Sequence, residues 1–324
     1  MRCPNLNELP LPSDFKTGWP WTVESHKPVL NQTTEYPSIC IVTPSFNQGE
    51  FIEETIRSIL LQGYPNLEYI IMDGGSTDNS VEIIKKYSPW LAYWVSAKDK
   101  GQAEAIYRGF EKSTSDIIGW VNSDDMLMPK ALFGFGKYFV DHPDTELVAG
   151  GGVTIDEKTR IKPSKWGDID FYYLDNRISF LRILIMKGFD FLQPASLWKR
   201  DAFFAVGGFD RSLNFCFDLD LYLRLTKRKS GRAIRQPVAA FRTHLATKTS
   251  RLQHVRLEEL EQLLNRHGLM NYPGWIQSFL AIGYRIWGII RHKIALLNYL
   301  IRPPKMDILQ SMSRELKNTK SHSI

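Results

Sequence analysis

Two adjacent carboxylates, Asp124 and Asp125, lie just after the apolar run 117–121, with Asn122 and Ser123 between. If this run is a strand of an open parallel sheet, the acids lie at its carboxyl end, where such sheets bind ligands. Successive side chains leave a strand on opposite faces, so the two acids can do different jobs. One can hold Mg²⁺ or Mn²⁺, because hard cations are typically held by one or two carboxylates plus substrate phosphates. The pair alone is a weak signal, since most acids at strand ends are solvated turn residues.

The elements around the pair alternate between strand and helix. Short continuous apolar runs are typical of strands buried on both faces of a parallel sheet, and segments with the helical period follow them. The expected strands are 38–43, 69–72, 92–96 and 117–121, and the expected helices are 50–61, 80–87 and 103–112. This alternation predicts an α/β fold with right-handed βαβ units, in which helices flank a mostly parallel central sheet.

The two ends of the chain differ from its middle. Prolines at positions 4, 10, 12, 20, 28 and 37 predict an irregular tail, because proline resists helix interiors and strand ladders. We expect Phe15, Trp19 and Trp21 to pin this tail onto the domain. A strand is expected at 147–153, compact loops at 193–198 and 207–210, and helices at 219–228 and 254–267. The predicted division is a tail (1–37), a main domain (38–252) and a helical C-terminal extension (253–324).

Composition sets broad limits. The 324 residues suffice for one large domain with appendages. The 43% apolar and 23% charged residues are close to ordinary globular values and argue against bulk disorder. The net charge of +6 and the pI of about 9.0 suit an anionic ligand or membrane surface but are too mild to indicate nucleic acid. Three cysteines without metal-ligand spacing indicate a reduced, cytoplasmic setting, and residues 1–21 show no signal peptide.

Six short motifs follow one another along the chain, and their order matters as much as their residues. They are Thr43-Pro44-Ser45-Phe46-Asn47, Asp73-Gly74-Gly75-Ser76-Thr77-Asp78, Asp99-Lys100-Gly101-Gln102, Asn122-Ser123-Asp124-Asp125, Gly207-Gly208-Phe209-Asp210 and Asp218-Leu219-Asp220. Over roughly residues 38–250 the chain resembles the family 2 glycosyltransferases of the GT-A fold, and the third motif is similar to a bacterial, polysaccharide-type subgroup. The resemblance implies a nucleotide-diphosphate sugar donor (UDP, GDP or dTDP), a divalent metal (Mn²⁺ or Mg²⁺) and inversion at the anomeric carbon.

The resemblance also implies donor-binding residues. Asp73 matches the acid that accepts a hydrogen bond from the donor base, and an Asx turn around its own glycines is the alternative. The residues after the first strand would line the base pocket or form an ordinary turn. The loop before the third helix would bring backbone close to the donor, because glycine allows close approach, or would merely lead into the helix. These two sets are Pro44, Ser45 and Phe46, and Lys100, Gly101 and Gln102.

In the resembled pattern Asp125 is the metal ligand and Asp124 lies nearer the ribose, while Asn122 stands where many relatives have an acid. The cation would stabilise the charge that builds on the diphosphate as the glycosidic bond breaks. Inversion also needs a general base for the acceptor hydroxyl. Asp218 matches that base and Asp220 is the runner-up, although an Asp at the start of a helix is also an ordinary N-cap.

Further downstream, His244 resembles a family histidine near the diphosphate or metal; a structural or surface histidine is the alternative. A basic cluster is expected to close over phosphates, unless it belongs to a solvated loop. It consists of Arg242, Lys248 and Arg251. Gln193 and Trp198 are expected on the acceptor side from their position alone.

The C-terminal stretch 275–305 combines apolar, aromatic and basic residues and has no acid. Its longest uncharged run, 270–284, is shorter than the ~20 residues that span a bilayer. This pattern suits an interfacial helix on an anionic membrane. Packing on the domain or on a dimer partner is the alternative that the sequence leaves open.

We therefore predict an inverting, metal-dependent glycosyltransferase that transfers sugar to a hydroxyl of a glycan or lipid-linked acceptor in cell-surface polysaccharide synthesis. It would be cytoplasmic, either free or peripheral on the inner face of the plasma membrane, with no nucleic-acid partner. One alternative is a sugar nucleotidyltransferase, but residues 43–47 lack the glycine and basic residues of its phosphate loop. Another is a non-catalytic nucleotide-sugar-binding protein. An oxidoreductase is disfavoured because G-x-G-x-x-G is missing.

Overall fold

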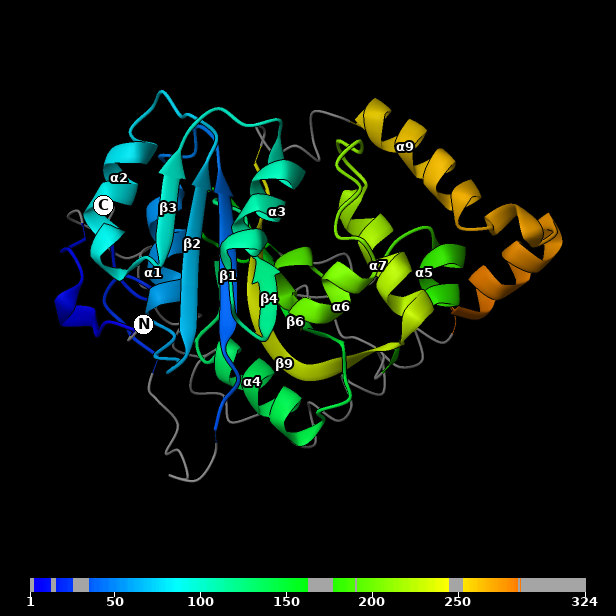
Figure 1. Cartoon of the computed structure of the whole chain (residues 1–324), viewed down its shortest axis with the longest axis horizontal. Helices are drawn as coiled ribbons and strands as arrows, with labels where there is room; N and C mark the ends of the chain where they lie inside the picture. Colours follow the sequence, from blue (N-terminus) through cyan, green and yellow to red (C-terminus); the bar gives the residue numbers. More distant parts are fainter. Residues whose placement is uncertain are drawn as a thin grey trace, which may run out of the picture.

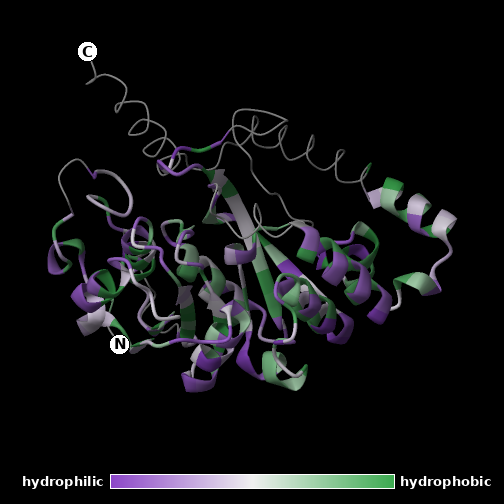
Figure 2. Ribbon diagram, turned by 90° about the horizontal axis from the view of Figure 1, so that it is seen from above, coloured by the Kyte–Doolittle hydropathy of each residue, from purple (hydrophilic) through white to green (hydrophobic). Residues whose placement is uncertain are grey.

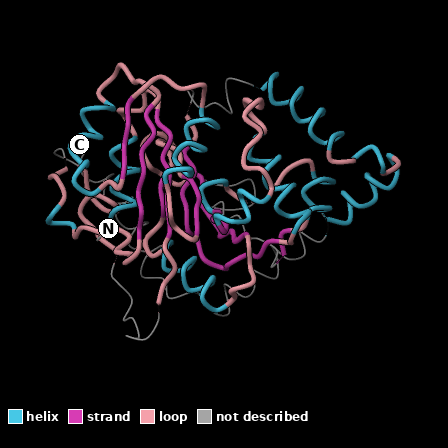
Figure 3. Tube along the Cα trace, in the orientation of Figure 1, coloured by secondary structure: helices cyan, strands magenta, loops and turns pink. Residues whose placement is uncertain are grey.

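A single mixed sheet runs through the molecule, with helices on both of its faces (Figures 1 and 3). The computed structural model describes residues 3–12, 16–25, 35–162, 177–189, 191–244, 253–284 and 286. Within these residues nine strands pair in the order β3-β2-β1-β4-β8-β6-β9-β5, and β7 pairs with β9 beside this path. The strands are β1 (Ile39–Ser45), β2 (Leu67–Asp73), β3 (Tyr93–Ser96), β4 (Ile117–Trp120), β5 (Met126–Leu127), β6 (Leu147–Ile155), β7 (Arg177–Ile178), β8 (Ser196–Lys199) and β9 (Gly231–Arg242).

The helices follow the strands in the expected alternation. They are α1 (Ile52–Leu60), α2 (Ser80–Tyr87), α3 (Gln102–Lys112), α4 (Ala131–Asp141), α5 (Phe180–Met186), α6 (Arg200–Ala205), α7 (Phe217–Arg228) and α9 (Gln253–Arg266), followed by a helix over 274–284. Strands β3, β2, β1 and β4 are parallel. The predicted α/β class is therefore confirmed, and the expected elements between 38 and 121 lie within two residues of the observed ones.

Alternation along the strands divides the core into two layers. Ile39 and Ile41 of β1 face a cluster that includes residues of α1, α2 and α4. Cys40 and Val42 face the opposite cluster, which includes residues of α3, α5, α6 and α7. Because both faces are covered, the four parallel strands read as continuous apolar runs.

The expectation of a loop at 193–198 is wrong for its second part. Residues 196–199 form β8, which pairs antiparallel with both β4 and β6. The close fit of β8 depends on Gly119 in β4, since a Cβ there would lie 2.2 Å from Leu197 Cδ2. Helix α4 gave no clear sequence signal because two glycines, Gly134 and Gly136, interrupt its apolar pattern. A Cβ at Gly136 would lie 2.4 Å from the Tyr64 hydroxyl, so this glycine lets α4 approach closely.

The N-terminal tail packs against the domain through its tryptophans, as expected. Trp19 and Trp21 are buried. The Trp19 indole donates to the Leu127 carbonyl at 2.9 Å, and the Trp21 indole donates to Glu54 at 3.2 Å. Phe15, the third aromatic expected to pin the tail, lies outside the described residues.

The extension begins with α9, close to the predicted helix at 254–267, and continues with the helix over 274–284. These two helices form the right-hand end of the molecule in Figure 1. No helix among the described residues is both long and apolar enough to cross a membrane.

Candidate active site

The loops after β1, β2 and β4 leave the sheet at one edge. In the register of the parallel strands, Ser45 at the end of β1 is the partner of Asp73 at the end of β2. Asp73 is in turn the partner of Ser96 at the end of β3. Beyond β4, the Val121 N–H donates to the Val42 carbonyl at 3.0 Å. The segment that carries the two adjacent acids therefore emerges beside the first two loops, as the parallel topology requires.

The β1 and β2 loops are tied to each other by side chains of their motifs. Asn47 is in the left-handed region (φ 51°), and its side-chain oxygen accepts from the Thr77 N–H at 2.8 Å. Its own N–H donates to the Ser76 hydroxyl at 2.8 Å. The Gly49 N–H donates to Asp78 at 2.9 Å. These motif residues hold the two loops in place, which spacing in the sequence did not reveal.

Asp73 forms the Asx turn that was its alternative role. Its Oδ2 accepts from the N–H groups of Gly75 and Ser76, at 3.1 and 2.9 Å, and from the Ser96 hydroxyl at 2.6 Å. Its Oδ1 accepts the Ser76 hydroxyl at 2.5 Å. A carboxylate oxygen has two lone pairs, so Oδ1 keeps one acceptor position, and recognition of a base by Asp73 stays a prediction.

Beside Asp73 lie an exposed ring and a buried hydroxyl. Phe46 is 61% exposed at the end of β1, and a Cβ at Gly74 would lie 3.4 Å from its ring. The Ser45 hydroxyl is buried and has no hydrogen-bond partner among the described residues. Buried polar groups are normally paired, so this hydroxyl is a candidate contact for a ligand. Pro44 lies within β1, and its register partner on β2 is Met72.

The segment before α3 reaches toward the acids. Lys100 is exposed. Gly101 has φ 114°, and its N–H donates to Asp99 at 2.8 Å. The first residue of α3, Gln102, donates from its side-chain amide to the Asn122 oxygen at 2.7 Å. Gln102 is thus linked to the loop that follows β4.

Asp125 is the inner member of the acidic pair. It is 1% exposed, and its oxygens accept from the Arg242 N–H at 2.9 Å and from the Asn122 amide at 3.1 Å. Burial raises the pKa of its carboxyl well above the ordinary value, and the charge of Asp124 raises it further. Asp124 is the outer member, with its Oδ2 3.1 Å from Nε2 of His244. The structure thus brings Asp124 and His244 together from loops 120 residues apart.

Arg242 is not available to phosphates, so that prediction is wrong. The residue is buried, and its guanidinium pairs with Glu54 of α1 and donates to the Asp124 carbonyl at 2.8 Å. A second branch reaches the Asp156 carbonyl at 3.0 Å. The other members of the expected basic cluster, Lys248 and Arg251, lie outside the described residues.

Residues 40–203, just over half of the chain, match the model of the family described as Glycosyl transferase family 2. This chain is a member of that family. Among its relatives, an uncharacterized glycosyltransferase of Rickettsia typhi is 26% identical over 240 residues, which are 72% of each protein. An uncharacterized glycosyltransferase of Haemophilus influenzae is 35% identical over 94 residues, 28% of this chain and 38% of that protein.

Solved structures show the same fold for this glycosyltransferase. The crystal structure of TarS 1–349 from S. aureus has a TM-score of 0.54 at 15% identity, covering 71% of this chain and 65% of that one. The mannosyltransferase PcManGT from Pyrobaculum calidifontis, in complex with GDP-Man and Mn²⁺, has a TM-score of 0.53 at 15% identity, covering 89% and 82%. The predicted GT-A fold is thereby confirmed.

The start of α7 packs against the end of β4 in this glycosyltransferase. The rings of Phe217 and Phe209 lie 5.9 and 5.4 Å from that of Trp120, the last residue of β4. Asp218 follows Phe217 directly, so it lies near the carboxyl edge of β4. It is in the first turn of α7, whose N-cap residue is Cys216, and its Oδ1 accepts from the Leu219 N–H at 2.7 Å. The alternative reading of Asp218 as the N-cap is therefore wrong, and its role as the base stays a prediction.

Asp220 serves as an anchor between helices. It is buried, with one oxygen 2.5 Å from Arg224 Nη2 and the other 2.9 Å from Nε2 of His267, just beyond α9. Burial alone would raise its pKa, but the hydrogen bonds from His267 and Arg224 outweigh burial and lower it.

Glu259 of α9 holds the loop that precedes α7. Its carboxylate accepts from the backbone N–H groups of Asn214, Phe215 and Cys216 at 2.6 to 2.9 Å. Sequence reasoning missed this role because the residue looks like one of several surface acids on an amphipathic helix. The extension thus positions the helix that carries Asp218.

The two residues expected on the acceptor side differ in outcome. Trp198 is fully buried, packed against Trp120 at a ring distance of 5.5 Å, so its assignment to the acceptor side is wrong. Gln193 is largely buried and donates to the Trp120 carbonyl at 3.0 Å, while its oxygen accepts from the Asn122 amide at 3.3 Å. It therefore supports the acidic loop from the side of β8.

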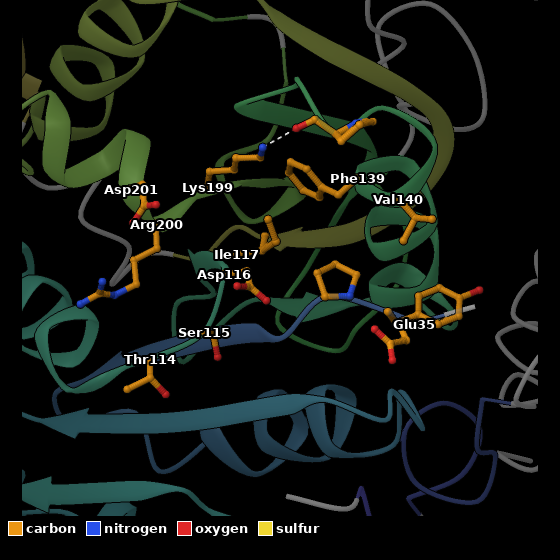
Figure 4. A pocket seen from close by; sticks show the side chains of 13 residues that line it. Glu35, Thr114, Ser115, Asp116, Ile117, Phe139, Val140, Lys199, Arg200 and Asp201 are labelled. Atoms are coloured by element: carbon orange, nitrogen blue, oxygen red, sulfur yellow. Dashed lines mark hydrogen bonds between the residues drawn. The ribbon is translucent and has the colours of Figure 1, made fainter. Parts of the chain in front are cut away.

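A hollow of about 660 Å³ lies elsewhere, at the amino end of β4 (Figure 4). Asp116, Lys199 and Arg200 are among the residues that line it, and none of the predicted site residues does. It is at the opposite end of β4 from the acidic pair.

Proposed function

We propose that this protein is an inverting, metal-dependent glycosyltransferase that uses a nucleotide-diphosphate sugar. The observation that carries this proposal is the pairing of Asp124 with His244 at the edge where β1, β2 and β4 end. The Phe46 ring and Asp73 are on the β1–β2 side of this point, and the first turn of α7 is near β4.

The described residues contain no cluster of three or more His, Cys, Asp or Glu suited to a metal. A cation that also binds a diphosphate needs fewer protein ligands, because phosphate oxygens complete its shell. Asp124 Oδ2 and His244 Nε2, 3.1 Å apart, fit such an open site. We assign the direct contacts to these two residues and a supporting role to Asp125, which is buried and accepts two hydrogen bonds. This departs from the expectation that Asp125 is the ligand and Asp124 contacts the ribose.

In the proposed reaction, an acceptor hydroxyl attacks the anomeric carbon as the bond from that carbon to the diphosphate breaks. The hydroxyl proton passes to the Asp218 carboxylate, and the nucleoside diphosphate leaves. A bound Mn²⁺ or Mg²⁺ would supply Lewis-acid stabilisation of the leaving diphosphate. Asp218 is preferred over Asp220 as the base, because both oxygens of Asp220 are engaged by Arg224 and His267.

Donor recognition is proposed for the loops after β1 and β2. The exposed Phe46 ring offers a flat surface for a base, and the Ser45 hydroxyl and Oδ1 of Asp73 offer polar contacts beside it. Lys100 and Gly101 would face the donor from the α3 side, and Gln102 would hold Asn122 in place. TarS has been crystallised with UDP-GlcNAc and PcManGT with GDP-Man, which supports a nucleotide-sugar donor here.

The acceptor is proposed to be a glycan or lipid-linked hydroxyl in cell-surface polysaccharide synthesis, on the cytoplasmic side. The three cysteines, all among the described residues, are buried and none forms a disulfide, which supports a reducing compartment.

A donor screen tests the proposal. The full chain with Mn²⁺ is offered UDP-, GDP- and dTDP-sugars, and melting shift and nucleotide release are recorded. Asp218→Asn should lower turnover by about 10²–10⁴-fold with donor binding intact, as expected for loss of a general base. Full activity of this variant would refute the base assignment, and donor binding without turnover by the wild type would favour the non-catalytic alternative. Release of pyrophosphate from a nucleoside triphosphate and a sugar phosphate would favour the nucleotidyltransferase.

The metal assignment needs a separate comparison. Mn²⁺ binding is measured by calorimetry on Asp124→Asn and Asp125→Asn, with the nucleoside diphosphate present. We expect the first variant to lose Mn²⁺ binding and the second to lose mainly thermal stability. The reverse result would restore Asp125 as the direct ligand.

A further inference from the structure

The helix over 274–284 carries a row of exposed apolar side chains on one side. Trp275 and Phe279 are each 72% exposed, and Ile282 and Ile286 are 55% and 52% exposed. Their spacing of four, three and four residues places them along one face of a helix. Large apolar side chains that gather on one exposed face mark an interaction surface.

The opposite side of the same helix is held by the domain. Leu280, Ala281 and Tyr284 pack against the core layer that includes α5 and α7. The Gln277 side chain donates to the Tyr272 carbonyl at 2.7 Å and anchors the first turn. The exposed row therefore points away from the domain along a helix whose other face is engaged. Figure 2 shows this helix at the right-hand end of the molecule, with hydrophobic segments in green.

The charge of this part of the chain indicates what covers the row. Residues 275–305 contain no Asp or Glu, while five Lys or Arg residues fall within the same stretch. They are Arg285, Arg291, Lys293, Arg302 and Lys305. Apolar and aromatic side chains combined in one stretch of sequence with basic residues and no acids suit an anionic lipid surface.

We propose that the row Trp275, Phe279, Ile282 and Ile286 docks this protein on an anionic membrane surface. The helix lies in the plane of the interface and does not cross the bilayer. Glu259 of the neighbouring α9 holds the loop before α7, so the extension that carries the row is linked to the helix that carries Asp218. The proposal depends on the exposed row and the charge pattern alone and does not require the proposed reaction.

Vesicle sedimentation tests this proposal. The full chain is mixed with vesicles of phosphatidylcholine, with or without phosphatidylglycerol, and the bound fraction is measured. We expect binding to the anionic vesicles and a loss of at least about tenfold in partition for Trp275→Ser/Phe279→Ser. Salt at ~1 M should weaken the wild-type binding, because it shortens the Debye length to ~3 Å.

Leu257→Ser is the matched control, since Leu257 is an exposed apolar residue on α9 outside the row. It should bind vesicles like the wild type. Equal binding by all three proteins, or no wild-type binding, would overturn the proposal. A wild-type dimer in light scattering that the double variant converts to a monomer, without vesicle binding, would assign the row to a second copy. A large drop in melting temperature in the double variant, again without vesicle binding, would mean that the row packs against other residues of the same chain.

Discussion

Replacing Arg242 by Met should destabilise this protein more than any exposed charge substitution. The guanidinium is buried, pairs with Glu54, donates to the carbonyls of Asp124 and Asp156, and lies over the Phe51 ring at 4.9 Å. Methionine keeps much of the length and apolar volume of the arginine. The variant therefore removes the charge and the hydrogen bonds while leaving only a small cavity.

The expected loss in the free energy of unfolding depends on the buried charge of Glu54, which remains after Arg242 is replaced. Removing one partner of a buried ion pair costs about 3–5 kcal/mol, because the other charge stays buried without compensation. Glu54 keeps its weaker contacts with the Trp21 indole at 3.2 Å and the Thr159 hydroxyl at 3.0 Å, which places the expectation at the lower end, about 3 kcal/mol. For a domain of this size that corresponds to a fall in melting temperature of roughly 6–12 °C.

Urea unfolding of the full chain measures this cost, and a double-mutant cycle with Glu54→Gln isolates the pair. We expect a coupling free energy of about 2–3 kcal/mol. Lys137→Ala is the control, because its pair with Asp141 is exposed at 67% and 44% and should contribute under about 0.5 kcal/mol. If Arg242→Met costs less than about 1 kcal/mol, or the cycle shows no coupling, the buried pair does not stabilise the fold as argued.

Three further substitutions have defined outcomes. Phe46→Ala should raise the donor KM with kcat little changed, because the exposed ring is proposed to stack on the base at about 1–3 kcal/mol; an unchanged KM in steady-state assays would remove it from the site. Asp220→Asn should cost about 3 kcal/mol at neutral pH. Because the folded pKa of Asp220 lies below its usual 3.8, the cost should be fully present above that value and disappear as pH falls through the folded pKa; a cost independent of pH in urea unfolding would contradict this. Gly119→Ala should cost about 1–3 kcal/mol by overpacking against Leu197, whereas Gly188→Ala, with no heavy atom within 4 Å of the added Cβ, should melt close to the wild type.

Local sequence patterns predicted an element correctly where the residues of that segment alone determine its secondary structure. Helix α2 runs over Ser80–Tyr87 as predicted, and β1 and β2 were found from short apolar runs. A strand buried on both faces must be apolar throughout, and a helix between sheet and solvent must repeat at its own period. The order of the motifs then indicated the family, which the family match over 40–203 confirms.

Features that depend on contacts between residues far apart in the chain were not predicted from the sequence. Strand β8 is four residues long and exists because Gly119 leaves room for Leu197. Arg242 looked like a phosphate-binding cation, yet it is neutralised by Glu54, 188 positions earlier. In each case the deciding contact joins residues far apart in the chain, and no local period records it.

The acids of the candidate site show the same difference between what the sequence indicates and what packing decides. Residue type and strand-end position singled out Asp124 and Asp125, and the family resemblance added Asp73, Asp218 and Asp220. Their environments come from packing: burial and the Arg242 N–H act on Asp125, His244 faces Asp124, and His267 engages Asp220. Whether a carboxylate is an anchor or is open to a ligand depends on desolvation and on neighbouring charges. Those quantities exist only once the strands, α7 and α9 have come together.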